Sequence, residues 1–489
     1  MKKLLILIFS ALLIFTMTAC TNNAADTSKA KNSDGQTVIR VVTKDDGPSN
    51  PESVKYYNTL EKALKRDENL NVKFQLVEVP SGDYSEKLNL MLTGGDIPDL
   101  IYFQGGDQQM AQQNLLENLT PYVKNSKYIK NILQPYDKER LKNYPYLLWI
   151  KPLDQKTPVI RKDWFDKMTT SQKLMANPTP DNYYAFLKEL VTTHPGGDKK
   201  PAYGITVAGD IAELDSTFQM AFGINQTWLK NSDGTYVFSK VSNNEKELLT
   251  YYHKLYTDGI LDPQYITKQW DTKEKAFYDG DTAVISGTNG KVIDLYNGKM
   301  TQVNGKQAEL VVLPAAKGEY QGFGATDVTK ESRGYAISSQ SKHKDLVFKV
   351  LDYLASPKGQ MFDRLGFENE DYKIDNGQIV LTDKYYNEWF ARYWEPSEFN
   401  IDKPLKTPLL SEPAVKSQDL VKQAYTQDNN FILPDKFVTN WDAMQNLYKE
   451  YATDIITGKR PVSDFDKFVQ EWNKAGGDEL TKYANQKLK

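Results

Sequence analysis

The first twenty residues constrain this chain more than any other stretch. Lys2 and Lys3 precede an apolar run over residues 4–15, and small residues then lead to Cys20. A basic start, a short apolar run and a small-residue cleavage site are typical of a secretory signal. The run is too short to span a bilayer, which takes ~20 apolar residues. The pattern therefore predicts a signal peptide over residues 1–20 and export of the remaining chain.

Cys20 stands at the predicted cleavage point. It is the one cysteine among 489 residues, so it has no disulfide partner within the chain. The stretch Met17-Thr18-Ala19-Cys20 resembles a bacterial lipobox, although Met17 stands where leucine is more common. In lipobox proteins the cysteine is diacylated and becomes the mature N-terminus. The resemblance implies a lipid anchor at Cys20 on the outer face of the cell membrane; the alternative is an unmodified thiol in an ordinary signal peptide.

The rest of the chain has the composition of a soluble protein. Residues 21–37 are polar without apolar periodicity, which indicates a flexible linker. The chain after residue 37 is long enough for two or three domains, and the hydrophobic and charged fractions of 40% and 26% are ordinary for globular proteins. A formal net charge of -3 gives no support for a nucleic-acid partner, which would require a basic face.

Most catalytic motifs are missing from the sequence. Three histidines, His194, His253 and His343, lie far apart without metal-ligand spacing, and there is no phosphate-binding loop, dinucleotide fingerprint or nucleophile elbow. We therefore predict a protein that is not an enzyme and needs no cofactor. A surface glycoside hydrolase or lyase stays open as the alternative, because Asp and Glu total 64 and the pairing of two carboxylates depends on the fold.

The alternation of short patterns predicts an α/β fold. β-rich runs alternate with helical spacing, and Asn50 is the expected N-cap of the first helix with Pro51 at its first position. The expected strands are residues 38–42, 72–79 and 98–103, and the expected helices are residues 51–65 and 83–92. Such a succession indicates a parallel sheet covered by helices, whose ligands lie at the carboxyl ends of the strands. The loops 44–47 and 104–107 are therefore expected at the edge of a cleft.

A series of motifs in a fixed order gives a more specific resemblance. The first is Gly94-Gly95-Asp96-Ile97-Pro98-Asp99 leading into Leu100-Ile-Tyr-Phe103. Further motifs lie at residues 160–168, 179–190, 252–265, 351–377, 455–458 and 472–478. From residue 38 to the C-terminus the chain resembles the extracellular solute-binding proteins of family 1, which are sugar receptors of bacterial ABC importers, and within them the large Gram-positive lipoproteins.

The resemblance implies an α/β clamshell of two lobes, each a mainly parallel sheet flanked by helices. We expect lobe 1 over residues 38–150 and 313–355, and lobe 2 over residues 151–312 and 356–489. The implied function is a monomeric, lipid-anchored receptor that captures an oligosaccharide between its lobes and passes it to the permease of an ABC transporter. A sensor or adhesin with the same fold is a third class.

Larger members of the family often hold calcium in a loop after the helix that corresponds to residues 179–190. In this chain the loop contains a single carboxylate, Asp198, followed by Lys199 and Lys200. Calcium requires six to eight oxygen ligands, several of them anionic. We therefore expect no metal site in this loop.

Two tryptophans are the main candidates for contact with a sugar. Trp270 and Trp394 stand in irregular, polar segments, and the resemblance implies that such tryptophans stack on sugar rings; packing in the core is the alternative for both. Phe103 is a third aromatic candidate. The polar candidates for ligand binding are Asp45, Asp46, Gln104, Asp107, Thr288, Asn289 and Glu395. For Thr288 and Asn289 the alternative is an Asn-Gly turn, and for the carboxylates it is a solvated loop charge.

Overall fold

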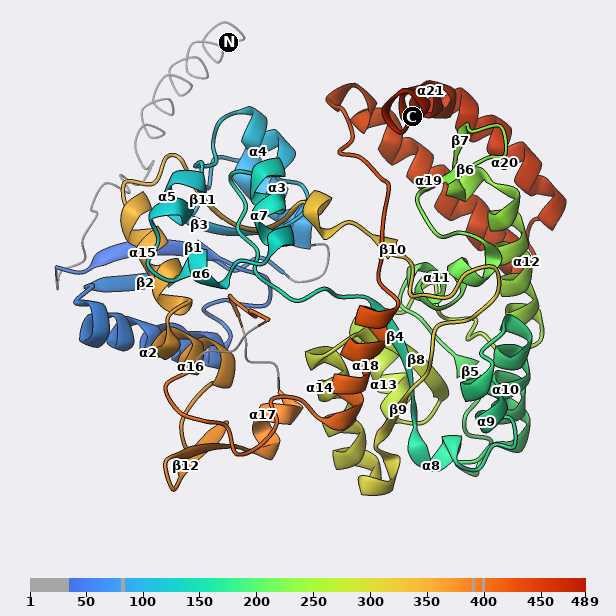
Figure 1. Ribbon diagram of the computed structural model, residues 1–489, viewed down its shortest axis with the longest axis horizontal. Coiled ribbons are helices and arrows are strands. Elements are labelled where there is room, and N and C mark those ends of the chain that lie inside the picture. The colour runs from blue at the N-terminus through green and yellow to red at the C-terminus, as the bar shows by residue number, and fades with distance from the viewer. Residues whose placement is uncertain (1–34, 81–83, 389–391, 398–400) are drawn as a thin grey trace, which may run out of the picture. The chain divides into compact units, whose positions relative to one another are not determined.

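The computed structural model describes residues 35–80, 84–388, 392–397 and 401–489 (Figure 1). The predicted signal peptide, Cys20 and most of the linker lie outside the described residues. The chain divides into two compact units: unit 1 is Met1–Tyr122 with Arg333–Val350, and unit 2 is Val123–Ser332 with Leu351–Lys489. No helix in the described part combines the length and apolar character that a membrane span requires. The lobe boundaries expected from the sequence stay a prediction.

Unit 1 contains a four-stranded sheet in the order β11-β3-β1-β2. β1 pairs in parallel with both β2 and β3, and β11 pairs antiparallel with β3. Its strands are β1 (Thr37–Val42), β2 (Val72–Leu76), β3 (Leu100–Gln104) and β11 (Arg333–Ile337). Its helices are α2 (Pro51–Glu68), α3 (Tyr84–Thr93) and α4 (Gln108–Gln112), and α5 (Thr120–Asn125) and α15 (Lys344–Leu354) cross its boundaries. The strand–helix alternation predicted for this part of the chain is confirmed.

The start of α2 shows how local sequence sets an element. The side-chain oxygen of Asn50 accepts hydrogen bonds from the backbone N–H groups of Glu52 and Ser53, and Pro51 opens the helix. Both features were expected, because an Asn cap satisfies N–H groups that lack a partner within the helix and proline lacks the N–H that would go unused there. The helix ends at Asn69, whose φ of 55° is left-handed.

Unit 2 contains a second four-stranded sheet in the order β5-β8-β4-β9. Only β5 and β8 are parallel, whereas β4 runs antiparallel to both β8 and β9. The expectation of a mainly parallel sheet thus holds in unit 1 but is wrong for this sheet. β4 is the first strand of this sheet along the chain, and it lies between two strands that run in the opposite direction. No local sequence pattern specifies this pairing. The helices α13, α14 and α18 lie beside β8 and β9 (Figure 1).

Unit 2 contains most of the strands and helices of the described chain. The strands are β4 (Lys156–Arg161), β5 (Tyr203–Ile205), β6 (Trp228–Lys230), β7 (Tyr236–Phe238), β8 (Thr282–Thr288), β9 (Leu310–Val312), β10 (Ala325–Thr326), β12 (Tyr372–Asp375), β13 (Gln378–Leu381) and β14 (Thr426–Gln427). The helices before residue 300 are α6 (Ile129–Ile132), α7 (Pro135–Asn143), α8 (Lys162–Phe165), α9 (Ser171–Ala176), α10 (Pro180–Thr193), α11 (Ala212–Phe218), α12 (Asn243–Thr257), α13 (Trp270–Tyr278) and α14 (Lys291–Asn304). The later helices are α16 (Pro357–Leu365), α17 (Asp383–Asn387), α18 (Glu412–Gln423), α19 (Asp435–Thr457), α20 (Phe465–Trp472) and α21 (Asp478–Lys487).

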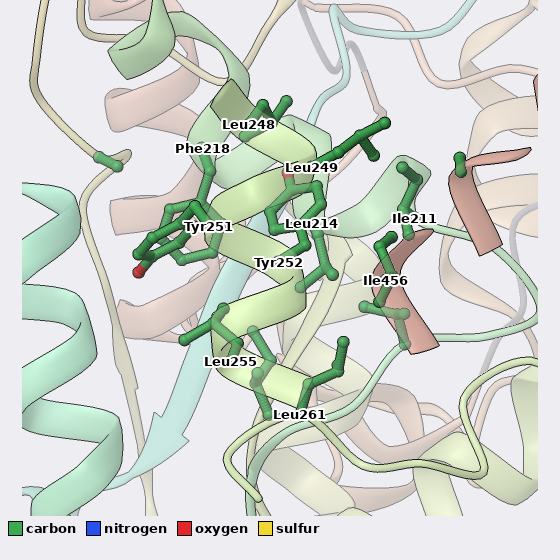
Figure 2. Close-up of a cluster of buried hydrophobic side chains, with 14 of the residues drawn as sticks. Ile211, Leu214, Phe218, Leu248, Leu249, Tyr251, Tyr252, Leu255, Leu261 and Ile456 are labelled. Carbon is green, nitrogen blue, oxygen red and sulfur yellow. The ribbon is translucent and has the colours of Figure 1, made fainter. Parts of the chain in front are cut away.

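The core of unit 2 forms where α11 and α12 face each other. Figure 2 shows Leu214 and Phe218 of α11 among Leu248, Tyr252 and Leu255 of α12, and all five side chains are fully buried. Their spacing of three or four residues puts them on one face of each helix. Burying each such side chain contributes roughly 1.5–3 kcal/mol. This packing fixes α11, which also carries Glu213, a residue of the candidate site.

Candidate ligand-binding site

The most exposed tryptophan of the described residues lies at the carboxyl end of β8. Thr288 at the end of β8 pairs in register with Lys156 at the start of β4, so both lie at one edge of the sheet. α13 packs on β8 and α11 on β4. Trp270, the first residue of α13, is 39% exposed, an exposure that no other tryptophan in the described part of the chain reaches. A large aromatic surface in water is unusual for a residue that otherwise serves packing.

The sequence around Trp270 starts the helix and holds the indole at its end. The backbone N–H of Gln269 donates to Thr272 Oγ1, and the Thr272 hydroxyl donates back to the Gln269 carbonyl, which fixes the first turn. Asp271 adds a negative charge at the positive end of the helix. Tyr296 of α14 supports the indole, with ring centroids 6.3 Å apart.

Two lysine ammonium groups lie against the indole of Trp270. Lys273 Nζ is 3.7 Å and Lys156 Nζ is 4.9 Å from the ring centroid, within the range of cation–π contacts. Both ammonium groups also contact Glu213 Oε1 of α11, at 2.7 Å and 3.1 Å respectively. Lys273 further donates to the Ser286 carbonyl of β8 at 2.9 Å. The site is thus assembled from four elements, α11, α13, β4 and β8.

Burial gives this ion pair an unusual electrostatic setting. Lys273 has no exposed surface and Glu213 is 3% exposed. Burial lowers the pKa of Lys273 to about 8, an effect that the charge of Glu213 opposes. Among the described residues, Glu213 Oε2 and Ser286 Oγ have no hydrogen-bond partner. Unmet polar atoms in the interior are uncommon in native proteins, so the base of this site has capacity for further hydrogen bonds.

Glu274, next to Lys273 on α13, supplies a partly exposed carboxylate at the same place. Burial raises the pKa of its carboxyl group, while the charge of Lys273, the indole N–H of Trp270 and the Tyr296 hydroxyl act in the opposite direction. The side chain of Lys156 is 36% exposed. An apolar ring face, an ammonium donor and a carboxylate acceptor thus lie together, and this combination suits a ring that carries both C–H groups and hydroxyls.

Thr288 and Asn289 follow the same strand but have different surroundings. Thr288 is the last residue of β8 and is partly exposed. Asn289 is 7% exposed, and its side chain accepts from the Gln155 N–H at 2.8 Å and donates to the Leu153 carbonyl at 3.3 Å. In this structure Asn289 fastens the segment before β4 to the end of β8, so its amide is already used.

Trp394 and Glu395 are core residues in this structure. Trp394 has no exposed surface, and its indole N–H donates to the Leu351 carbonyl at 2.9 Å. Glu395 is 6% exposed and lies 2.6 Å from Lys151 Nζ and 2.5 Å from a guanidinium nitrogen of Arg364. Burial opposes its charge, but Lys151 and Arg364 together lower the pKa of Glu395 to about 2. Trp394 therefore packs in the core, which was the alternative to contact with a sugar. The burial of Trp394 and Glu395 does not favour the ligand role predicted for them.

The candidates in unit 1 divide in the same way. Asp46 is 9% exposed and accepts from the hydroxyls of Thr43 at 2.7 Å and Ser53 at 2.5 Å, which ties its loop to α2. Phe103 and Asp107 have no exposed surface, because β3 is flanked by strands on both sides and α4 follows directly. Asp45 is exposed with a φ of 66°, and Gln104 is partly exposed. Of the ligand-binding candidates in unit 1, only Asp45 and Gln104 thus keep surface for a ligand.

Sequence reasoning missed four residues around Trp270: Lys156, Glu213, Lys273 and Glu274. Lys273 follows Trp270 by three residues, a spacing at which helical side chains meet, so this contact had a local signal once a helix was expected at Trp270. Glu213 lies 60 residues from Lys273. Nothing near it in sequence indicates a partner, because the fold alone brings α11 and α13 together.

Two lysine ammonium groups make hydrogen bonds at the loop after α10, in which we expect no metal site. Lys167 Nζ donates to the Pro195 carbonyl at 2.8 Å, and Lys200 Nζ donates to the Asp279 carbonyl at 2.7 Å. Backbone hydrogen bonds between Gly196 and Lys200 close the turn. Across the described residues, no group of three or more His, Cys, Asp or Glu side chains is arranged to hold a metal ion. Calcium independence of this loop stays a prediction.

The two sheets with flanking helices, and a site at the carboxyl end of β8, define a protein of the solute-binding class. The family model of the bacterial extracellular solute-binding proteins matches residues 50–361. The chain belongs to this family, as its motifs predicted.

Individual relatives are distant but cover most of the chain. The chain is 20% identical over 465 residues to the lipoprotein LipO of Bacillus subtilis, covering 89% of each protein. It is 21% identical over 450 residues to the polygalacturonan/rhamnogalacturonan-binding protein YtcQ of the same species, covering 86% of each. The Streptococcus pneumoniae ABC-transporter substrate-binding protein FusA, solved in complex with kestose, matches with a TM-score of 0.64 at 17% identity, over 92% of this chain and 99% of FusA. This likeness confirms the two-domain α/β fold of solute-binding proteins.

Proposed function

We propose that this protein is a monomeric, lipid-anchored receptor that binds an oligosaccharide and delivers it to the permease of an ABC transporter. The observation that carries the ligand class is Trp270, an indole that is exposed at the carboxyl end of β8 and held by buried charges. Membership of the solute-binding family supports the transport role. The protein would return its ligand unchanged, so it would not act as an enzyme.

The chemistry around Trp270 matches that of a sugar ring. A sugar has an apolar C–H face and a rim of hydroxyls, and each hydroxyl that leaves water without a partner costs free energy. The exposed indole offers apolar area, Lys156 offers N–H donors and Glu274 offers an acceptor. Thr288 adds a hydroxyl at the same sheet edge. Among the candidates in unit 1, Asp45 and Gln104 keep surface that could meet hydroxyls of a ligand.

The relatives point to complex glycans as the first ligands to test. YtcQ is described as binding polygalacturonan and rhamnogalacturonan, and FusA was solved with kestose. LipO is described as a lipoprotein, which supports the proposed anchor at Cys20. These similarities suggest an uncharged fructo-oligosaccharide or an acidic pectic oligosaccharide as the ligand of this chain.

A thermal-shift screen tests the proposal directly. Purified residues 21–489 would be melted with kestose, with galacturonan oligosaccharides and with a panel of unrelated oligosaccharides. A ligand present at about a hundred times its dissociation constant adds roughly 2.7 kcal/mol to the free energy of unfolding, which raises Tm by several degrees. Trp270→Ala serves as the matched control and should show a smaller shift. A panel without any shift contradicts the proposal, and shortened products in the recovered glycan would instead favour the hydrolase or lyase alternative.

A further inference from the structure

The indole of Trp270 has one face toward the protein interior. Lys273 Nζ lies 3.7 Å from the ring centroid, and Lys273 has no exposed surface. The side of the ring that this ammonium covers is therefore closed to solvent. Lys156 Nζ also lies 4.9 Å from the same centroid, so the exposed part of the indole is the surface that these two ammonium groups leave uncovered. Cation–π contacts are strongest where the ammonium is desolvated, so this contact favours one orientation of the ring.

The ammonium of Lys273 is itself held in place by groups from other elements. It lies 2.7 Å from Glu213 Oε1 and donates to the Ser286 carbonyl at 2.9 Å. A lysine ammonium has three N–H donors, so two hydrogen bonds and the contact with the indole use its full capacity. Glu213 is fixed in turn by α11, which packs into the core of unit 2. The position of the indole thus depends on a chain of buried contacts that ends in the core.

We propose that Lys273 is a positioning residue of the ligand site: its buried ammonium, held by Glu213, covers one side of the indole of Trp270 and fixes the ring for contact with a sugar. This role rests on the proposed function. It makes the Trp270 subsite a platform for stacking on one side, and a sandwich of the indole between two sugar rings is excluded. Because the buried charges already hold the indole in one orientation, the side chain loses less conformational entropy when a ligand binds to it.

The charge on Lys273 provides a direct handle on this role. The charged groups that face it are Glu213 from α11, Lys156 from β4 and Glu274 from α13. Burial lowers the pKa of Lys273 to about 8, and the charge of Glu213 raises it. An exposed lysine titrates near pH 10.4. A signal from Trp270 that changes near pH 8 therefore reports on Lys273 and not on surface lysines.

The test uses 5-fluorotryptophan and ¹⁹F NMR of the ligand-free protein. The resonance of Trp270 is identified by its loss in Trp270→Phe. In the otherwise unchanged protein it should shift with a midpoint near pH 8. In Lys273→Met the shift should vanish, and in Glu213→Gln its midpoint should move to lower pH, because the neighbouring negative charge is gone. Lys275→Met is the matched control, since Lys275 lies on the same helix with a side chain that is 74% exposed, and it should keep the original titration.

Binding to the glycan found in the thermal-shift screen gives the second readout. Lys273→Met should weaken that binding about three- to thirtyfold, the factor that corresponds to losing a contact of roughly 0.6–2 kcal/mol. Melting curves show whether each variant is folded. If Lys273→Met does not fold, the pH titration of the Trp270 resonance in Glu213→Gln tests the role of Lys273 instead.

Two results would overturn the role of Lys273. One is a Trp270 resonance that does not titrate near pH 8 or titrates equally in Lys273→Met. The other is unchanged glycan affinity in a folded variant. Absence of glycan binding by the unmutated protein overturns the proposed function instead, so the two failures are distinguishable.

Discussion

At the scale of single residues, burial separates side chains that look alike in the sequence. Trp270 and Trp394 both stand in polar, irregular surroundings, yet one is 39% exposed and the other has no exposed surface. Glu395 and Glu274 are both acidic residues close to a tryptophan, but their pKa values are shifted in opposite directions. Lys151 and Arg364 form ion pairs with Glu395 at 2.6 Å and 2.5 Å and outweigh the effect of its burial, whereas burial outweighs the effect of the cations near Glu274.

The two tryptophans should respond in opposite ways to truncation. Trp270→Ala is expected to weaken glycan binding by about 1–3 kcal/mol, the scale of one stacked aromatic, with little change in Tm. Trp394→Ala is expected to lower the free energy of unfolding by roughly 3–5 kcal/mol, because it leaves a cavity in the core. Calorimetry with the bound glycan and melting of each variant measure the two effects. Equal behaviour of the two variants would contradict this division.

Glu395 should make the stability of the protein depend on acid. Its pKa lies near 2 in the folded protein and near 4.5 when unfolded, so its contribution is fully present above about pH 4.5 and is lost as the pH falls toward 2. The shift corresponds to a contribution on the order of 3 kcal/mol. Glu395→Gln should lower stability at pH 7 and flatten its decline between pH 4.5 and 2, as measured by urea unfolding.

Glu388→Gln is the control for this experiment. Glu388 is 56% exposed and lies 3.8 Å from Lys384, a distance and exposure at which an ion pair contributes little. Its variant should follow the unmutated protein at every pH. A Glu395→Gln protein with the same acid profile as this control would show that the buried carboxylate is not the source of the dependence.

At the scale of elements, the loop after α10 shows how hydrogen bonds of lysines and of the backbone hold a turn. Lysine ammonium groups donate to carbonyls of this loop and of the segment after α13. Asp198 is the only carboxylate in the loop, and its φ is 47°. A tight turn of this kind is stabilised by the backbone bonds between Gly196 and Lys200 without any ligand.

Calcium should therefore leave the stability of this protein unchanged. Melting curves recorded with millimolar calcium and with a chelator are expected to superimpose, because one carboxylate and neighbouring lysines cannot balance a divalent cation. Differential scanning calorimetry measures the comparison. A clear drop in Tm on chelation would show that a calcium site exists in the chain.

At the scale of the whole molecule, the family and the fold agree with the motif order that the sequence displays from residue 38 onward. The two units each contain a four-stranded sheet, and the residues proposed to contact ligand are distributed over both. The proposed transport role requires in addition the predicted lipid anchor, which lies outside the described residues.

Replacing the cysteine tests the proposed anchor. Cys20→Ser is expected to give a folded body without lipid modification, because serine lacks the thiol to which the diacylglyceryl group would be attached. Incorporation of labelled fatty acid and fractionation of cells measure the outcome, and the melting curve of the body serves as the control for folding. A serine variant that still carries label and stays with the membrane would contradict the anchor.

The sequence by itself determined the features that depend on near neighbours. Asn50 and Pro51 start α2 as expected, and the strands and helices of unit 1 follow their periodicity. Each of these signals comes from residues a few positions apart, where helix and strand geometry repeat regularly.

Only the tertiary structure decided which candidates keep surface for a ligand. The burial of Phe103 and Trp394, the antiparallel course of β4 and the contact of Lys273 with Glu213 all involve segments far apart in the chain. Burial and ion pairing depend on which segments pack together, and no pattern within a short window records that. The charged support of Trp270 is visible for this reason only once α11, α13, β4 and β8 have been brought to one edge of the sheet.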